Sequence, residues 1–330
     1  MHRTRLACQA TGRRPLPWRP LLLSALLLLA ACGRSDAPPE LPGAATEPAG
    51  AVRLLAGHLQ RNDLVAFARD ALPEAERNQL AAAWAEDRSR WPLTELPLED
   101  RIAPVLATLA ADGAEQDLQR EFDRQLGGQD AALRDAARSL GLFGTQYLRQ
   151  QGDYSDEERA HYTQVVEALS GWAAKAPLGS RKHAHDAIAR LAAAARATGL
   201  GSEDDLRRAG MEDTLRRLGP FLADTKQVAA EYGLDLDRSL ADLRTGLVEQ
   251  QGDRATVRIH YPLGDAEIDT VVSLTRRDGR WYLSDYLAHA ADLLAEPDGG
   301  AALPDGLPAP PPPGLPPPPD DQAPEPGAGR

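Results

Sequence analysis

The chain has almost no cysteine. Cys8 and Cys32 are the only two, and both lie in the first tenth of the 330 residues. The rest of the chain therefore cannot form a disulfide, use a thiol nucleophile or hold a metal through sulfur. Basic residues are also outnumbered, with 37 Lys plus Arg against 49 Asp plus Glu and a net charge of −12. Because nucleic-acid binding depends on clustered Lys and Arg, this balance argues against a nucleic-acid partner.

Long apolar runs are missing as well. The run at residues 21–31 is followed by none of comparable length, and as a helix it would measure about 16 Å at 1.5 Å per residue. A bilayer core of about 30 Å needs roughly 20 residues to span it. With 26% charged and 42% hydrophobic residues, the composition indicates a soluble globular body and not a protein that crosses the membrane several times.

Local catalytic motifs are absent too. The sequence contains no His-Glu-x-x-His helix, no Gly-x-Ser-x-Gly elbow, no phosphate-binding glycine loop and no calcium-binding loop. Ser170-Gly171 and Gly179-Ser180 lack the flanking glycines that would expose a nucleophile. We therefore expect no enzyme activity, no metal site and no cofactor, although an active site assembled from distant residues would leave little local trace.

The most suggestive cluster is His183-Ala184-His185-Asp186. It resembles the start of the histidine motif of metallo-β-lactamase-like hydrolases, but that motif continues with Asp and His where this chain has Ala187 and Ile188. On a helix, residues two apart lie about 200° apart, so the two histidines would not reach one ion. We expect an exposed first turn of a helix. The histidines at 58, 161, 260 and 289 are isolated in sequence.

Acidic clusters and tryptophans have structural explanations. Glu203-Asp204-Asp205 follows Ser202, where negative charge would stabilise a helix start, and Asp235 with Asp237 fits a turn and N-cap. Cation binding or acid/base chemistry is the alternative for both groups. Trp172 and Trp281 fall on apolar stripes and should pack in the core, whereas Trp91, in a loop before a proline, is the candidate for a surface contact.

The N-terminus has the pattern of an export signal. Five arginines and no acidic residue occupy the first twenty positions, and the apolar run 21–31 follows. Residues Leu29-Ala30-Ala31-Cys32-Gly33 resemble the lipobox of bacterial lipoproteins, a resemblance limited to about the first 33 residues. It implies cleavage between Ala31 and Cys32, and a diacylglycerol and further acyl chains such as palmitate on Cys32. Several acyl chains anchor a protein stably, whereas one does so only marginally.

The resemblance also implies a location in the cell. Gly33 stands where some lipoproteins carry an aspartate for inner-membrane retention, which favours an outer-membrane protein facing the periplasm. Removing residues 1–31 leaves 32 Lys plus Arg against 49 Asp plus Glu, a net charge of −17. Contact with the membrane should therefore come from the acyl chains on Cys32 and not from a basic patch. An ordinary secretory signal with a chance cysteine is the alternative.

Both ends of the mature chain have compositions typical of disordered segments. Residues 32–51, rich in Pro, Gly and Ala, are predicted to be a flexible tether whose coil spans roughly 25 Å. Residues 297–330 hold 13 prolines and 6 glycines among 34 residues and should sample polyproline II. We expect this tail to be a passive spacer, with docking of its prolines into an aromatic-lined groove of a partner as the alternative.

The residues between predict an α+β fold, with a helical part at 52–243. A helix should begin near Pro73 and include Trp84. Ser155 and Glu158 form a capping-box pattern ahead of an apolar face that ends near Ala173. Another helix is expected at 181–198 with Gly199 as its stop. A further helix should start near Glu212 and be kinked at Pro220.

After Arg244 the apolar period changes to two, which predicts an antiparallel β-meander with a closing helix within 244–296. Turn sequences at Gly252-Asp253, Gly264-Asp265 and Asp278-Gly279 separate three or four strands. The segment 252–283 resembles the sheet half of small exported α+β domains related to the nuclear-transport-factor-2-like superfamily. That resemblance implies a curved sheet packed against helices and no particular activity.

Together these patterns predict a lipid-anchored protein of the cell envelope that acts as a non-enzymatic binding or scaffold module, with a protein of the envelope as a possible partner. Two alternatives stay open. One is a hydrolase of cell-wall or lipid material, which would require histidines such as His161, His183 or His185 to meet carboxylates in one pocket. The other is a carrier of a hydrophobic ligand, which would require a large apolar cavity between sheet and helices.

Overall fold

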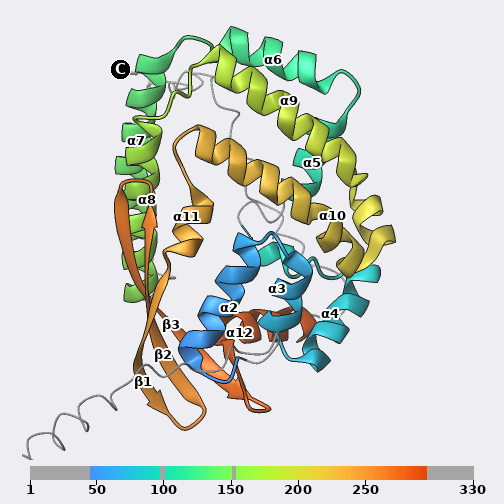
Figure 1. Ribbon diagram of the computed structural model, residues 1–330, viewed down its shortest axis with the longest axis vertical. Helices are drawn as coiled ribbons and strands as arrows, with labels where there is room; N and C mark the ends of the chain where they lie inside the picture. The colour runs from blue at the N-terminus through green and yellow to red at the C-terminus, as the bar shows by residue number, and fades with distance from the viewer. Residues whose placement is uncertain (1–44, 97–100, 151–153, 296–330) are drawn as a thin grey trace, which may run out of the picture. The chain divides into compact units, whose positions relative to one another are not determined.

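A computed structural model describes residues 45–96, 101–150 and 154–295. In these residues eleven α-helices and a short 3-10 helix, Leu93–Glu95, accompany four strands (Figure 1). The α-helices, in chain order, are α2 (Pro48–Gln60), α3 (Leu64–Ala71), α4 (Glu74–Ala85), α5 (Ile102–Ala110), α6 (Ala114–Gln125), α7 (Asp130–Gln150), α8 (Asp156–Ala173), α9 (Arg181–Thr198), α10 (Glu203–Glu231), α11 (Leu236–Ala241) and α12 (Ser284–Ala295). The predicted α+β class, mainly helical and then a small antiparallel sheet, is confirmed.

The four strands form one antiparallel meander in sequence order. They are β1 (Arg244–Gln251), β2 (Arg254–Leu263), β3 (Ala266–Arg277) and β4 (Arg280–Leu283). The connecting turns contain residues with positive φ, Gly252 and Gly264 at 59° and the pair Asp278 and Gly279 at 52° and 79°. Tight hairpins need such left-handed residues to match the twist of the strands. The turn sequences identified above therefore fix the strand boundaries.

Helix ends follow the predicted caps. Ser155 accepts a hydrogen bond from the Glu158 backbone N–H and its own N–H donates to the Glu158 carboxylate, which completes the capping box of α8. α9 ends at Gly199, which has a left-handed φ of 62°. Ser202 and Asp235 cap α10 and α11 through their side chains. Local side-chain chemistry thus sets these boundaries.

α10 consists of two helical stretches joined at Gly210, whose φ of 73° and ψ of 170° are not helical. The first stretch begins at Glu203, after the predicted cap Ser202, and the second begins at Met211, next to the predicted start at Glu212. The break is at Gly210, whereas the sequence predicted a kink at Pro220. Pro220 lies inside the helix, ten residues beyond the break. Glycine adopts a positive φ without the steric cost that other residues meet, so the chain changes direction there.

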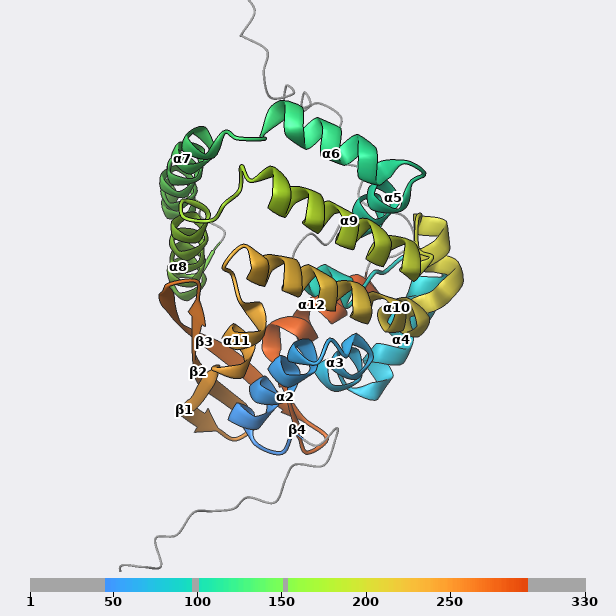
Figure 2. The ribbon, with the colours of Figure 1, turned by 45° about the horizontal axis from the view of Figure 1, so that its top comes forward.

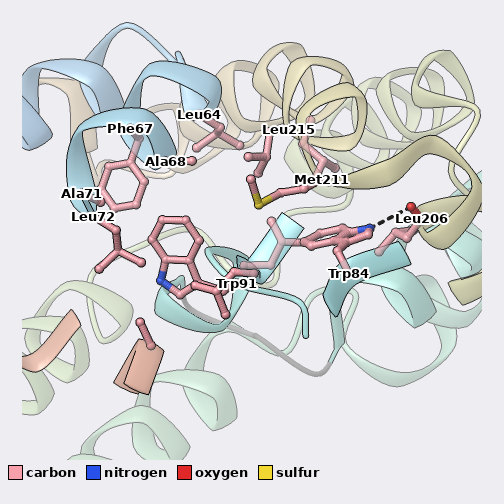
Figure 3. Packing of buried hydrophobic residues seen from close by; sticks show 14 of the residues in the cluster. Leu64, Phe67, Ala68, Ala71, Leu72, Trp84, Trp91, Leu206, Met211 and Leu215 are labelled. Carbon is pink, nitrogen blue, oxygen red and sulfur yellow. Dashed lines mark hydrogen bonds between the residues drawn. The ribbon is translucent and has the colours of Figure 1, made fainter. Parts of the chain in front are cut away.

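The largest group of buried side chains joins the helices to the end of the sheet. Trp84 and Trp91 lie at its centre, both fully buried, and Trp84 Nε1 donates to the Leu206 carbonyl at 2.9 Å (Figure 3). Tyr282 of β4 and Leu287 of α12 belong to the same group. The prediction of a surface contact for Trp91 is therefore wrong, because its indole fills space beside α3 that the local sequence does not reveal.

The fold begins before the expected end of the tether. Ala45 is 2% exposed and its carbonyl accepts a hydrogen bond from the Trp281 N–H at 3.0 Å. α2 starts at Pro48 and packs Val52 against the sheet, next to Trp281 and Val257. Residues 45–51 thus belong to the folded part.

α8 connects the sheet to the outermost helix of this region. The Gln164 side chain makes two hydrogen bonds of 2.9 Å with the backbone of Asp269 on β3. α7 runs antiparallel to α8 and packs against it, so α8 lies between β3 and α7 (Figures 1 and 2). In the described ranges no helix is both long and apolar enough to cross a membrane.

Candidate functional site

A buried group of charges surrounds Asp70. Its carboxylate accepts hydrogen bonds from His58 Nε2 at 2.7 Å, from Arg69 at 2.9 and 3.2 Å, and from Arg280 at 3.2 Å. Arg61 lies 3.0 Å from His58 Nδ1. Because a guanidinium only donates and a carboxylate only accepts, His58 carries its proton on Nε2 and accepts on Nδ1.

The same group sets the ionisation of Asp70. Burial opposes the charged form, but the hydrogen bonds from His58 and Arg69 and the positive charge of the guanidinium outweigh it, so the pKa of Asp70 lies far below its usual value. The side chain of Asp70 has no exposed surface. With its oxygens occupied by three protein partners, this carboxylate joins α2, α3 and β4 and offers no open position to a substrate.

The histidines singled out from the sequence do not come together. His183 Nδ1 lies 2.8 Å from the Ser180 hydroxyl, at the start of α9, and its ring packs beside Tyr232. His185 Nε2 lies 3.1 Å from the Asp123 carboxylate of α6. His161 is on α8 next to Tyr261, where burial lowers its pKa.

The two remaining isolated histidines lie elsewhere. His260 is 3.8 Å from Asp269 on the neighbouring strand, and His289 Nδ1 is 2.7 Å from the Glu95 carboxylate. Over residues 45–96, 101–150 and 154–295, no group of three or more His, Asp or Glu is placed to hold a metal ion.

Open grooves border the β2–β3 turn. Two adjoining hollows of about 270 and 360 Å³ share Trp172, Lys175 and Asp265 in their walls. Lys175 Nζ is 2.7 Å from Asp265, and Trp172 Nε1 donates to the Tyr232 carbonyl at 2.8 Å. The Lys175 ammonium and the Trp172 N–H in these walls are thus bonded to other protein groups.

The α7–α8 hairpin presents a different kind of surface. α7 contacts α8 through small residues, and an added methyl group at Gly141 would lie only 2.4 Å from Ser170 Oγ. A methyl group added at Gly144 would likewise lie 3.1 Å from the Val166 side chain. Such close packing leaves the larger side chains of α7 on its other sides, toward solvent.

Those larger side chains are apolar and exposed. On α7 the exposed fractions are 68% for Leu140, 69% for Phe143 and 51% for Tyr147, and on α8 they are 41% for Tyr162 and 36% for Leu169. Side chains of roughly 150–250 Å² exposed to this degree leave on the order of 500 Å² of largely apolar surface. We name these five residues the hairpin face.

Helix geometry places the five residues on one side of the hairpin. On α7, Leu140, Phe143 and Tyr147 lie roughly 100° from the line of contact with α8, and on α8, Tyr162 and Leu169 lie roughly 80° from it in the same rotational sense. In an antiparallel pair, equal offsets in the same sense point to the same side. Leu142, 74% exposed, projects from the opposite flank of α7.

The hairpin face carries little charge. Leu133 and Ala136 lie on the same side of α7 as this face. Two carboxylates, Glu158 and Asp285, lie near its edge, and that of Glu158 already accepts from the Ser155 N–H at 2.8 Å. Burial, and then the neighbouring negative charges, raise the pKa of Tyr162 above its usual value. The face therefore suits an apolar, uncharged ligand surface.

Aromatic rings are concentrated there. Phe143 and Tyr147 stack with ring centres 6.4 Å apart, and Tyr154 meets Tyr162 edge to face at 5.3 Å. Asp285, in the first turn of α12, interacts electrostatically with Tyr162. The start of α12 therefore lies in the neighbourhood of Tyr162.

The sequence alone did not predict this surface. Its signal is the spacing of Leu140, Phe143 and Tyr147, three and four residues apart on one helix, opposite the small residues Gly141 and Gly144. Such a stripe is ordinarily read as buried core, and only the packing shows which of the two faces is covered. Cys32 and Ala31, the predicted lipidation and cleavage positions, lie outside the described residues.

Comparison of the chain with protein-family models, curated proteins and solved structures finds no match.

Proposed function

We propose that this chain is a lipid-anchored protein of the cell envelope that works as a non-enzymatic binding module, with the hairpin face as its binding surface. The observation that carries this proposal is the exposure of Leu140, Phe143 and Tyr147, each more than half exposed on one side of α7. Exposed apolar patches of more than a few hundred Å² mark interaction surfaces on soluble proteins.

The proposed cellular location rests on the sequence. The lipobox-like segment ending at Cys32 supports an acylated protein of the outer membrane that faces the periplasm. The segment between Cys32 and Ala45 would then hold the folded part within a few tens of Å of the bilayer. A binding module in this position would recruit or position an envelope protein whose contact surface is apolar and uncharged.

The hydrolase alternative has less support. It calls for histidines and carboxylates in one pocket, whereas His183 and His185 are engaged with Ser180 and Asp123. The carrier alternative calls for an apolar cavity between sheet and helices. Val257, Leu274 and Trp281 fill the space between the sheet and α2 instead.

A pull-down from crosslinked envelopes tests the proposal. Phe143→Glu places a charge at the centre of the hairpin face and should reduce recovery of the main partner at least tenfold. Leu142→Glu changes the neighbouring residue on the other flank of the same helix and should leave recovery unchanged. Equal recovery with both variants would exclude the hairpin face as the binding surface, and enrichment of cell-wall or lipid hydrolysis activity with the purified chain would favour the hydrolase.

A further inference from the structure

The hairpin face is an apolar surface with no cover among the described elements. About 500 Å² of largely apolar area is exposed, on a chain whose mature form has a net charge of −17. A stable dimer buries about 800 Å² per partner, so this face is small for self-association. Two bodies of the same strong negative charge also repel each other, as would anionic lipid head groups.

The chain carries a segment of matching chemistry. Residues 306–319 read Gly-Leu-Pro-Ala-Pro-Pro-Pro-Pro-Gly-Leu-Pro-Pro-Pro-Pro and contain no charge, while Asp305 and Asp320 flank them. Proline-rich segments favour polyproline II, which loses little entropy on binding and docks on surfaces lined by aromatic rings. The rings of Phe143, Tyr147 and Tyr162 provide such a surface.

The segment is also within reach. Asp285, in the first turn of α12, is near enough to Tyr162 to raise its pKa, and the 12 residues of α12 extend about 18 Å. From Ala295 to residue 306 the chain can extend up to about 36 Å. Residues 306–319 would measure about 43 Å as polyproline II, longer than the roughly 31 Å of α7. Because the segment is joined to the domain, its effective concentration at the face is about millimolar.

From these observations we propose that residues 306–319 of the C-terminal tail dock on the hairpin face of the same chain. The tail covers Leu140, Phe143 and Tyr147 until a partner displaces it, so it sets the affinity that a partner must exceed. The inference rests on the proposed function in one respect, that the hairpin face is a binding surface.

Crosslinking within the purified chain tests the tail directly. The mature chain with Cys32→Ser has no thiol, so Gly314→Cys introduces a single site for a benzophenone photo-crosslinker. Docking predicts crosslinks from this position to α7 and α8 within one chain. The double variant Phe143→Ala with Tyr147→Ala should lower their yield at least fivefold, and Leu142→Ala should not change it. Leu142, Phe143 and Tyr147 are exposed, and circular dichroism checks that each variant is folded.

Several outcomes would overturn the docking. Crosslinks spread evenly over the surface, or a yield that the double variant does not change, would show that the tail does not occupy the face. A dominant crosslinked dimer would make a second copy the occupant. Flotation of the chain with phosphatidylethanolamine–phosphatidylglycerol vesicles that depends on Phe143 would make it a lipid surface. Since no partner is present in this experiment, its failure leaves the envelope pull-down to decide the proposed function separately.

Discussion

Asp70 is the residue at which three segments of the chain meet. His58 of α2, Arg69 of α3 and Arg280 of β4 all donate to a carboxylate that has no exposed surface. Each of these donors depends on the Asp70 carboxylate as its acceptor, because a buried donor without an acceptor destabilises the fold by the energy lost when it leaves water. A single carboxylate therefore couples the N-terminal helices to the last strand.

Replacing Asp70 with Asn should lower the free energy of unfolding by about 2–3 kcal/mol, since it leaves these donors facing an uncharged amide, two of them partly in water. Urea unfolding followed by circular dichroism measures the change. Asp186→Asn removes an exposed carboxylate paired with Lys182 and serves as the control, with no change expected. Equal stability of the Asp70 variant and the original chain would exclude a structural role for the cluster.

The same residue predicts a pH dependence. The pKa of Asp70 is lowered in the folded chain, so its contribution to stability is present above the unfolded pKa, near 3.8, and is lost as the pH falls below it toward the folded pKa. Stability of the original chain should therefore fall more steeply between about pH 5 and pH 2 than that of the Asp70→Asn variant. Parallel curves over this range would contradict the assignment.

At the scale of elements, the α7–α8 hairpin depends on two glycines. Gly141 lies where an added Cβ would be 2.4 Å from Ser170 Oγ and 2.5 Å from its Cβ. A larger residue would push α7 away from α8 and disturb the surface that the two helices share. The close packing of α7 against α8 therefore positions the hairpin face, which lies on another side of both helices.

Gly141→Ala should destabilise the chain by about 1–2 kcal/mol, because the clash exceeds the gain in helix propensity. Gly171→Ala on α8 meets nothing within 4 Å, so it should stabilise the chain by about 0.5–1 kcal/mol. Thermal and urea unfolding compare the two variants. In the double variant Gly141→Ala with Ser170→Gly, the smaller side chain at position 170 should relieve the clash. A change in the free energy of unfolding equal to the sum of the two single-variant effects would argue against this contact.

The elements show which features the sequence determines locally. The capping box at Ser155 and the stop at Gly199 were predictable because each depends on side chains within a few residues. The burial of Trp91 was not, since it depends on segments distant in sequence. The hairpin face was missed for the same reason, because a stripe such as Leu140, Phe143 and Tyr147 gives the same pattern whether it is covered or exposed.

At the scale of the whole molecule, the proposed anchor and the hairpin face have different roles. Acyl chains on Cys32 would fix the location, and the face would provide the contact. Cys32→Ser should release the protein from membranes and abolish labelling with radioactive palmitate, because Cys32 is the only cysteine in the lipobox-like segment. Membrane fractionation with palmitate labelling measures both effects, and unchanged labelling would reject lipidation at this position.

The two proposals for the hairpin face also combine at this scale. A tail that covers the face in every copy would keep this acidic chain from exposing apolar surface between encounters with a partner. A partner would then compete with a segment held at about millimolar effective concentration. Removing residues 297–330 should therefore strengthen partner recovery in the envelope pull-down, by up to about tenfold if the tail occupies the face most of the time.

Photo-crosslinking in intact cells tests whether the hairpin face binds a partner, with a photoreactive residue placed in turn at each position of α7 from 135 to 149. If the hairpin face binds a partner, products heavier than the chain should form at positions 136, 140, 143 and 147 and be weak at 135, 138, 142 and 149. Products of equal yield at all positions, or a maximum centred on Leu142, would show that the hairpin face is not the binding surface.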